Sequence, residues 1–78
     1  MGRKNLTGKR IAEARKTSNP FITQLDLVAR MQTLGIPMDQ SKLSKIESCD
    51  RAVTDIELKG FAEALHVSVE WLLEASER

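Results

Sequence analysis

The sequence predicts an all-α fold built from five short helices. A local pattern occurs five times: an apolar residue, a residue that can cap a helix, three further positions and a second apolar residue. The capping oxygen can accept a hydrogen bond from a free backbone N–H group, and the two apolar side chains can pack across the helix start. Apart from an ambiguous stretch at 67–71, no segment alternates like a β-strand. The five capping residues are Thr7, Thr23, Asp39, Thr54 and Ser68.

Residues that break helices separate the five expected elements. Thr54 with Glu57 completes a capping box at the fourth start, and Thr23 with Asp26 forms a shorter variant at the second. Each of the first four helices is followed by residues that end helices or form turns. In chain order these residues are Asn19-Pro20, Gly35 with Pro37, Cys49-Asp50, and His66.

A period of 3.6 residues selects the apolar side chains expected in the core. Phe61 and Trp71 are most simply core residues. The second and third helices are joined only by the residues around 35–38, so they must turn sharply on each other, which outlines a helix-turn-helix unit. The expected core residues are Ile11, Ala14, Leu27, Met31, Leu43, Ile46, Leu58, Phe61, Ala62, Leu65, Trp71 and Leu72.

The composition is that of one small globular domain. With 78 residues, 41% apolar and 29% charged, we expect a single domain over 1–78, with its core at about 6–74 and short flexible ends. No apolar run approaches the ~20 residues needed to cross a bilayer, and no secretory signal is evident, so we expect a cytoplasmic protein without a membrane partner. The lone Cys49 fits a reducing compartment and cannot form an internal disulfide.

Candidate catalytic and metal-binding patterns are weak. The single His66 has no second histidine and no matching cysteine or acidic spacing for a metal site. The serines lack the companions of a nucleophilic triad, and a chain this small leaves little room for a substrate pocket. We therefore expect no enzyme activity, no cofactor and no small-molecule ligand.

Charge is distributed unevenly along the chain. Residues 1–16 hold six basic residues against Glu13 alone, whereas residues 53–78 hold six acidic residues against Lys59 and Arg78. On charge alone, a solvated charge run is the favoured explanation, and the pI of 7.9 is below the strongly basic value of many nucleic-acid binders. The asymmetry permits an anionic partner but does not require one.

The segment 39–48 carries the most informative polar face. Wound as a helix, it points Leu43 and Ile46 inward, with Glu47 beside them. Small serines allow a helix to approach another surface closely, and the amide of Gln40 suits adenine in the DNA major groove. Ser41 is versatile, and Lys45 suits guanine or a phosphate; the alternative is a plain solvated face. The outward residues are Ser41, Ser44, Lys45 and Ser48, flanked by Gln40 and Lys42.

The chain resembles the phage-repressor and Cro-like helix-turn-helix family over about residues 6–74. The segments that carry the resemblance, in order, are GKRIAEARK, ITQLDLVARM, LGI, DQSKLSKIE, TDIELKGFAEAL and HVSVEWLL. The resemblance implies a compact five-helix, lambda-repressor-like DNA-binding domain of a transcriptional regulator, of the repressor type. It also implies a homodimer on a double-stranded, pseudo-palindromic operator.

The resemblance also assigns roles to residues. It implies base reading by Gln40, Ser41, Ser44 and Lys45. Phosphate contacts are implied for Gln24, Lys42 and Arg51. A surface arginine without a partner is the alternative for Arg51. A structural ion pair is implied between Arg15 and Glu47, which would join the first helix to the third.

Three departures from the family pattern affect the expected geometry. The connections at 18–21 and 35–38 are each about two residues longer than in the shortest members, which affects the angle of the third helix. Asp39 places a negative charge where a neutral cap is usual; it should cap well but repel phosphate, unless it accepts a hydrogen bond from cytosine. Cys49 stands where glycine often ends the helix. A left-handed cysteine would be strained, so we expect the helix to end differently.

Two further expectations concern protein partners. Val69 and Leu73 lie on the last helix beyond what the core needs, which suggests a weak two-fold contact, although such residues also occur on monomers. The acidic carboxyl-terminal third suggests an alternative function, a protein-binding module such as an antitoxin or adaptor that retains the helix-turn-helix fold.

Overall fold

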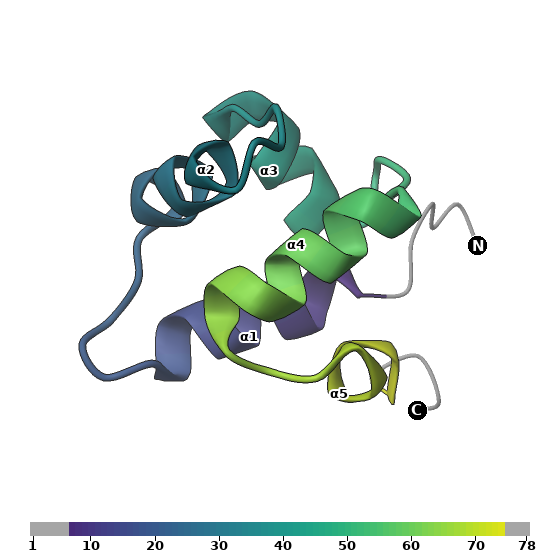
Figure 1. The fold of residues 1–78 in the computed structure, drawn as a ribbon. Helices are drawn as coiled ribbons and strands as arrows, with labels where there is room; N and C mark the ends of the chain where they lie inside the picture. The colour runs from purple at the N-terminus through teal and green to yellow at the C-terminus, as the bar shows by residue number, and fades with distance from the viewer. Residues whose placement is uncertain (1–6, 75–78) are drawn as a thin grey trace.

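A computed structural model of the chain describes residues 7–74, and its five helices are connected by short loops (Figure 1). Within these residues there is no β-strand, which confirms the all-α class. None of the described helices combines the length and apolar character that a bilayer crossing requires. The predicted flexible ends concern 1–6 and 75–78, which lie outside the described residues. The helices are α1 Gly8–Thr17, α2 Gln24–Thr33, α3 Gln40–Glu47, α4 Asp55–Leu65 and α5 Val69–Glu74.

The five helices begin directly after the five predicted capping residues. The Thr23 and Thr54 hydroxyls accept hydrogen bonds from backbone N–H groups three residues on, and both helices have complete capping boxes. Asp39 accepts from the Lys42 N–H at 2.8 Å, and the Ser68 hydroxyl accepts from the Trp71 N–H at 3.0 Å. Two details differ from expectation: the second-helix box is complete, and the Thr7 side chain makes no cap hydrogen bond.

Helices α2, α3 and α4 end in the same backbone motif. After each helix, one residue takes the left-handed conformation: Gly35 at φ 82°, Cys49 at φ 67° and His66 at φ 59°. The next N–H group donates to a carbonyl five residues back, as in the bond from Asp50 to the Lys45 oxygen at 2.8 Å. The expectation that α3 would avoid a left-handed cysteine was therefore wrong. The hydrogen bonds of this motif and the burial of Cys49 outweigh a backbone cost of about 1–2 kcal/mol.

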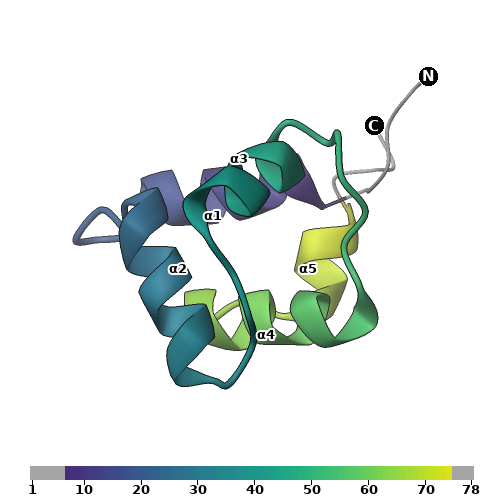
Figure 2. The same ribbon diagram turned by 90° about the horizontal axis from the view of Figure 1, so that it is seen from above.

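The helices enclose one apolar core. Viewed from above, α1 and α3 lie along one side and α4 along the opposite side, with α2 and α5 at the two ends (Figure 2). Leu58 and Trp71 are only half-buried, contrary to expectation, and the Arg10 guanidinium stacks on the Trp71 ring at 4.2 Å. The fully buried large side chains are Phe61, Ile11, Leu27, Met31, Leu43, Ile46 and Leu72. Further core residues that the periodicity omitted are Ile22, Val28, Met38 and Ala64.

Helix α3 packs on α1 and α2, and a glycine permits its close approach to α1. A Cβ atom on Gly8 would overlap the carbonyl oxygen of Ile46 and lie 3.1 Å from the Cys49 sulfur. The start of α1 therefore rests directly on the backbone at the end of α3. This contact fixes α3 at the edge of the fold, with one side turned outward.

Candidate nucleic-acid interface

The outward side of α3 carries the polar residues that the helical periodicity of the sequence predicted there. Leu43 and Ile46 have no exposed surface and anchor the helix to the core. Lys42 is half-buried at the flank. Because the exposed side chains at the centre of this face are serines, the backbone of α3 is more accessible than it would be beneath long side chains. The exposed residues, which we call the α3 outer face, are Gln40, Ser41, Ser44, Lys45 and Ser48.

A buried ion pair ties α3 to α1. Two nitrogens of Arg15, Nε and Nη2, donate to the two carboxylate oxygens of Glu47 at 2.9 and 2.8 Å. The side chains are only 7% and 10% exposed, and Arg15 Nη1 also donates to the Ile22 carbonyl at 3.2 Å. The pair implied by the family resemblance is thus present. Removing one member would leave a charge in a poorly solvated site, which typically costs about 3–5 kcal/mol.

Gln24 links this ion pair to the α3 outer face. Its amide nitrogen donates to Glu47 Oε1 at 3.1 Å. Its amide oxygen accepts from Gln40 Nε2 and from the Ser44 hydroxyl, each at 3.3 Å. A continuous hydrogen-bond network, which we call the Arg15–Gln40 network, therefore runs from Arg15 on α1 to Glu47 at the end of α3, then through Gln24 on α2 to the start of α3. Only the Arg15–Glu47 part of this network was expected; the bonds of Gln24 to Glu47, Gln40 and Ser44 join residues 16 to 23 positions apart, and no local pattern indicates them.

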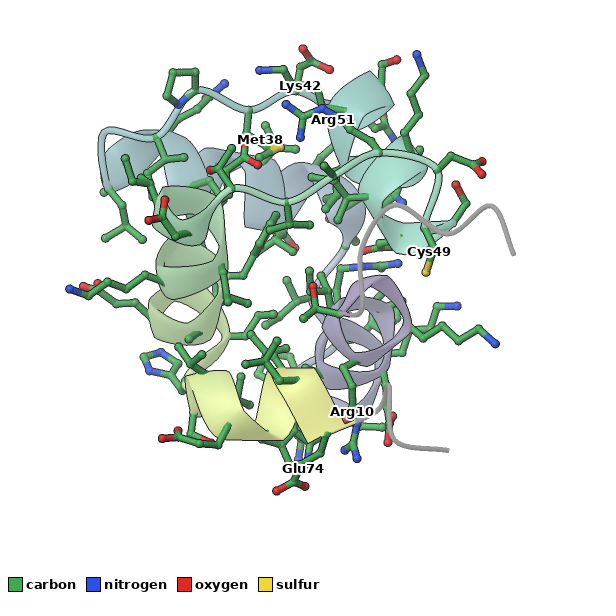
Figure 3. All side chains as sticks on the ribbon, turned by 90° about the vertical axis from the view of Figure 1, so that its right-hand side faces the viewer. Arg10, Met38, Lys42, Cys49, Arg51 and Glu74 are labelled. Atoms are coloured by element: carbon green, nitrogen blue, oxygen red, sulfur yellow. The ribbon has the colours of Figure 1, made fainter. Side chains whose placement is uncertain are left out.

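Charges around the α3 outer face have mixed sign. Lys45 makes no ion pair with any residue between 7 and 74. Lys42 and Arg51 both lie at the top of the view in Figure 3, where α3 and the loop after it are drawn. Asp39 and Asp50 are close by, but each accepts a hydrogen bond, from the Lys42 N–H and from the Ser48 hydroxyl respectively. Hydrogen bonding within the chain therefore engages both of these carboxylates.

Arg51 has a partner, so its interpretation as an unpaired surface arginine is wrong. Its Nη1 atom donates to Glu57 Oε1 at 3.2 Å and to the Ala52 carbonyl at 3.1 Å. Glu57 is buried and also closes the capping box of α4 by accepting from the Thr54 N–H. This ion pair fastens the loop after α3 to the start of α4. The Arg51 side chain is still 30% exposed.

The two residues predicted for a dimer contact have different environments. Val69 is half-buried and packs against the core, because α5 lies across α1 and α4; it is not surplus to the core as expected. Leu73 is 38% exposed. Of the predicted pair, Leu73 is therefore the more exposed residue, although most of its surface is also covered.

A second surface with exposed apolar groups lies along α4 and the turn after α2. Two adjoining shallow hollows share Leu34 and Glu63 in their lining. Ile56 is 67% exposed and Leu34 is 37% exposed. Charged residues, including Arg30 and Lys59, alternate with these apolar side chains. Among the described residues, no group of three potential metal ligands occurs.

Comparisons of the chain with protein-family models, curated proteins and solved structures found no match. The interpretation of the α3 outer face consequently depends on its own geometry and on the resemblance in the sequence.

Proposed function

We propose that the protein is a sequence-specific, double-stranded DNA-binding transcriptional regulator, of the repressor type. In this proposal α2 and α3 form a helix-turn-helix unit, and α3 enters the major groove. The observation that carries it is the α3 outer face: an exposed, serine-rich surface on a helix that a buried ion pair and two core side chains hold in place. A face that served only solubility would more usually carry Glu and Lys, which are better helix formers than serine.

The chemistry of the α3 outer face suits base edges. Gln40 offers a donor and an acceptor, which is the pattern that adenine presents in the major groove. Lys45 can donate to guanine or to a phosphate, and Ser41 and Ser44 can donate or accept. These side chains are all exposed, so they can reach the bases without any rearrangement of the core.

Phosphate contacts are proposed for the residues that flank this face. Lys42 and Arg51 supply positive charge, and Gln24 at the start of α2 can use its second amide hydrogen. Some backbone N–H groups at the starts of α2 and α3 already have acceptors within the chain: Asp26 accepts from the Thr23 N–H group, the Thr23 hydroxyl accepts from the Asp26 N–H group, and Asp39 accepts from the Lys42 N–H group. We therefore assign most of the phosphate affinity to side chains.

The proposal is tested by selecting bound sequences from random duplexes. The affinity of the protein is then measured for the selected duplex and for a duplex of scrambled sequence. We expect a consensus site that is bound roughly 10³-fold or more tightly than scrambled duplex. Failure to enrich any sequence, together with equal affinity for all duplexes, would contradict sequence-specific binding.

We expect the protein to occupy a pseudo-palindromic site as a homodimer, with Leu73 in the contact. Sedimentation at several concentrations, with and without the selected duplex, measures the assembly. Two protomers should sediment with each duplex, and Leu73→Glu should weaken binding while leaving the fold intact. One protomer per duplex at saturation would rule out the dimer.

The surface along α4 favours a second candidate, a protein-binding module such as an antitoxin or adaptor. Exposed Leu34 and Ile56 beside charged residues are typical of protein contacts. This candidate would be favoured if a purified partner protein binds in stoichiometric amount and the Ile56→Asp variant no longer binds it. The unaltered protein should then bind no DNA duplex.

A further inference from the structure

The surface along α4 has a protruding apolar side chain near one end of the helix and a hollow near the other. Ile56, in the first turn of α4, is 67% exposed. The hollow lies at the last turn, where the end of α2 packs beside α4 (Figure 2). Its volume of about 380 Å³ is ample for an isoleucine side chain. The residues that line it are Arg30, Thr33, Leu34, Glu63, Ala64 and His66.

Neither helix formation nor core packing accounts for Ile56. Isoleucine is a poorer helix former than lysine or glutamate, because its branched side chain loses rotamer freedom in a helix. Most of the side chain also lies outside the core. Leu34 and the half-buried Ile36 line the hollow beside it, so exposed apolar surface continues from Ile56 toward the end of α4. A continuous apolar surface of this kind is typical of a contact with another molecule.

Two opposite charges lie between the ends of this surface. Lys59 and Glu63 are both exposed, are one helical turn apart and line the same hollow as Ile56. Their spacing would permit an ion pair within the helix. Neither residue, however, forms an ion pair with any residue between 7 and 74. Both charges are therefore available to an outside partner.

The order of these features makes the surface complementary to itself. A two-fold axis brings the same surface of two copies together, so that each residue meets a different residue of the other copy. When two α4 helices lie antiparallel with the axis midway between Lys59 and Glu63, Lys59 of each copy faces Glu63 of the other. The same axis brings Ile56 of each copy to the hollow at the end of the other copy's α4.

We propose that the surface along α4 binds a second copy of this chain in this antiparallel, two-fold arrangement. Ile56 enters the hollow of the other copy, and two intermolecular ion pairs between Lys59 and Glu63 form beside it. The proposal goes beyond the proposed function, because the contact requires no DNA. It is also separate from the contact proposed for Leu73, which lies on α5.

Reversing the two charges separately and together tests the proposal. Sedimentation equilibrium of the full chain without DNA measures the association. We expect a dissociation constant on the order of 0.1 mM for the unaltered protein, because the surface is small. Lys59→Glu places a like charge opposite Glu63, and the symmetry repeats this contact, so association should weaken about tenfold. Glu63→Lys should have the same effect, and the variant that carries both changes should associate like the unaltered protein.

Further variants test the apolar contact and the location. Ile56→Asp should abolish the association, because a carboxylate would have to enter the hollow. Lys9→Glu and Glu13→Lys are the matched controls, since these exposed residues on α1 have the same types and the same spacing. They should leave the association unchanged. All the substituted side chains are exposed, and thermal unfolding of each variant checks that it is folded.

Three results would overturn the proposal. The first is an unaltered protein that remains monomeric at every concentration, as expected if a different protein covers the surface. The second is a doubly reversed variant that associates no better than the single variants, because the two charges then do not face each other. The third is unchanged association of Ile56→Asp. None of these measurements involves DNA, so their outcome is independent of the proposed function.

Discussion

Lys45 is the residue of the α3 outer face whose contribution to DNA binding is most easily isolated. It is exposed, lies in the last turn of α3 and makes no ion pair with a residue between 7 and 74. Lys45→Ala should weaken duplex binding by roughly 1–3 kcal/mol if Lys45 contacts a base, with a changed preference at one position. A uniform loss across sequences would instead indicate a phosphate contact.

The matched control for this prediction is Lys59→Ala, since Lys59 is exposed on α4 away from the α3 outer face. It should leave affinity for the selected duplex close to that of the unaltered protein. Equal affinities of both variants and the unaltered protein would remove Lys45 from the proposed interface. Affinity is measured by titration at one fixed salt concentration.

His66 provides a prediction about stability. It takes the left-handed conformation after α4, with φ 59°, and its side chain is exposed. Glycine adopts this conformation without the Cβ penalty, so His66→Gly should raise the free energy of unfolding by about 1 kcal/mol. His66→Ala, which keeps the Cβ atom, should bring no comparable gain. Chemical denaturation of the three proteins measures the difference, and a less stable glycine variant would contradict it.

Sequence patterns predicted single residues well where the cause is local. The three residues of the left-handed helix ends were all identified as breaks, but only Gly35 has the residue type that indicates the conformation. Cys49 was expected to avoid it, because a local rule takes no account of the burial that holds the residue in place. Gln24 was expected to contact only phosphate, since its partners Glu47 and Gln40 come together only in the folded chain.

At the scale of helices, the starts were predictable because each capping signal lies within four residues of the helix that it begins. All five capping residues directly precede a helix. The packing of the helices against one another was harder to predict from the sequence. Ile22 and Met38 directly precede capping residues, where the local pattern requires an apolar residue, and both also fill the core between helices. Trp71 was expected to be buried, but it is half-buried, and the Arg10 guanidinium stacks on its ring.

The contact between α1 and α3 leads to a prediction about Gly8, and Gly60 on α4 serves as the comparison. Gly8→Ala places a Cβ atom onto the Ile46 carbonyl oxygen, which is backbone and cannot move without shifting α3. We expect a loss of about 1–3 kcal/mol in the free energy of unfolding, although alanine is the better helix former. In Gly60→Ala the new atom meets the end of the Ile36 side chain, which can rotate away.

The comparison of these two variants is made by chemical denaturation under identical conditions. Gly8→Ala should be the less stable of the two and should also bind the selected duplex more weakly, because it displaces α3. If Gly8→Ala is as stable as the unaltered protein, the close backbone contact does not determine the position of α3.

At the scale of the whole molecule, the proposed function depends on only a few cations. Lys42, Lys45 and Arg51 are the positive side chains assigned to the DNA surface, and the net charge of the chain is only +1. If each neutralises one phosphate, the logarithm of the binding constant should fall with the logarithm of salt concentration with a slope of about −3 per protomer. Lys45→Ala should make that slope shallower by about one.

Salt titration over a range around physiological ionic strength measures this slope. Binding that is insensitive to salt would mean that the phosphates contribute little, contrary to the charges proposed at the interface. A much steeper slope would mean that residues outside the three named here also contact the DNA backbone.

The central claim is that the α3 outer face is the surface that binds duplex DNA. The most direct test is to record the backbone amide signals of the ¹⁵N-labelled protein by NMR while adding the selected duplex. We predict that the largest shifts occur at Gln24 and along 40–48, while Ile56, Lys59 and Glu63 on α4 change little. Shifts confined to α4, with those of 40–48 unmoved, would contradict the account.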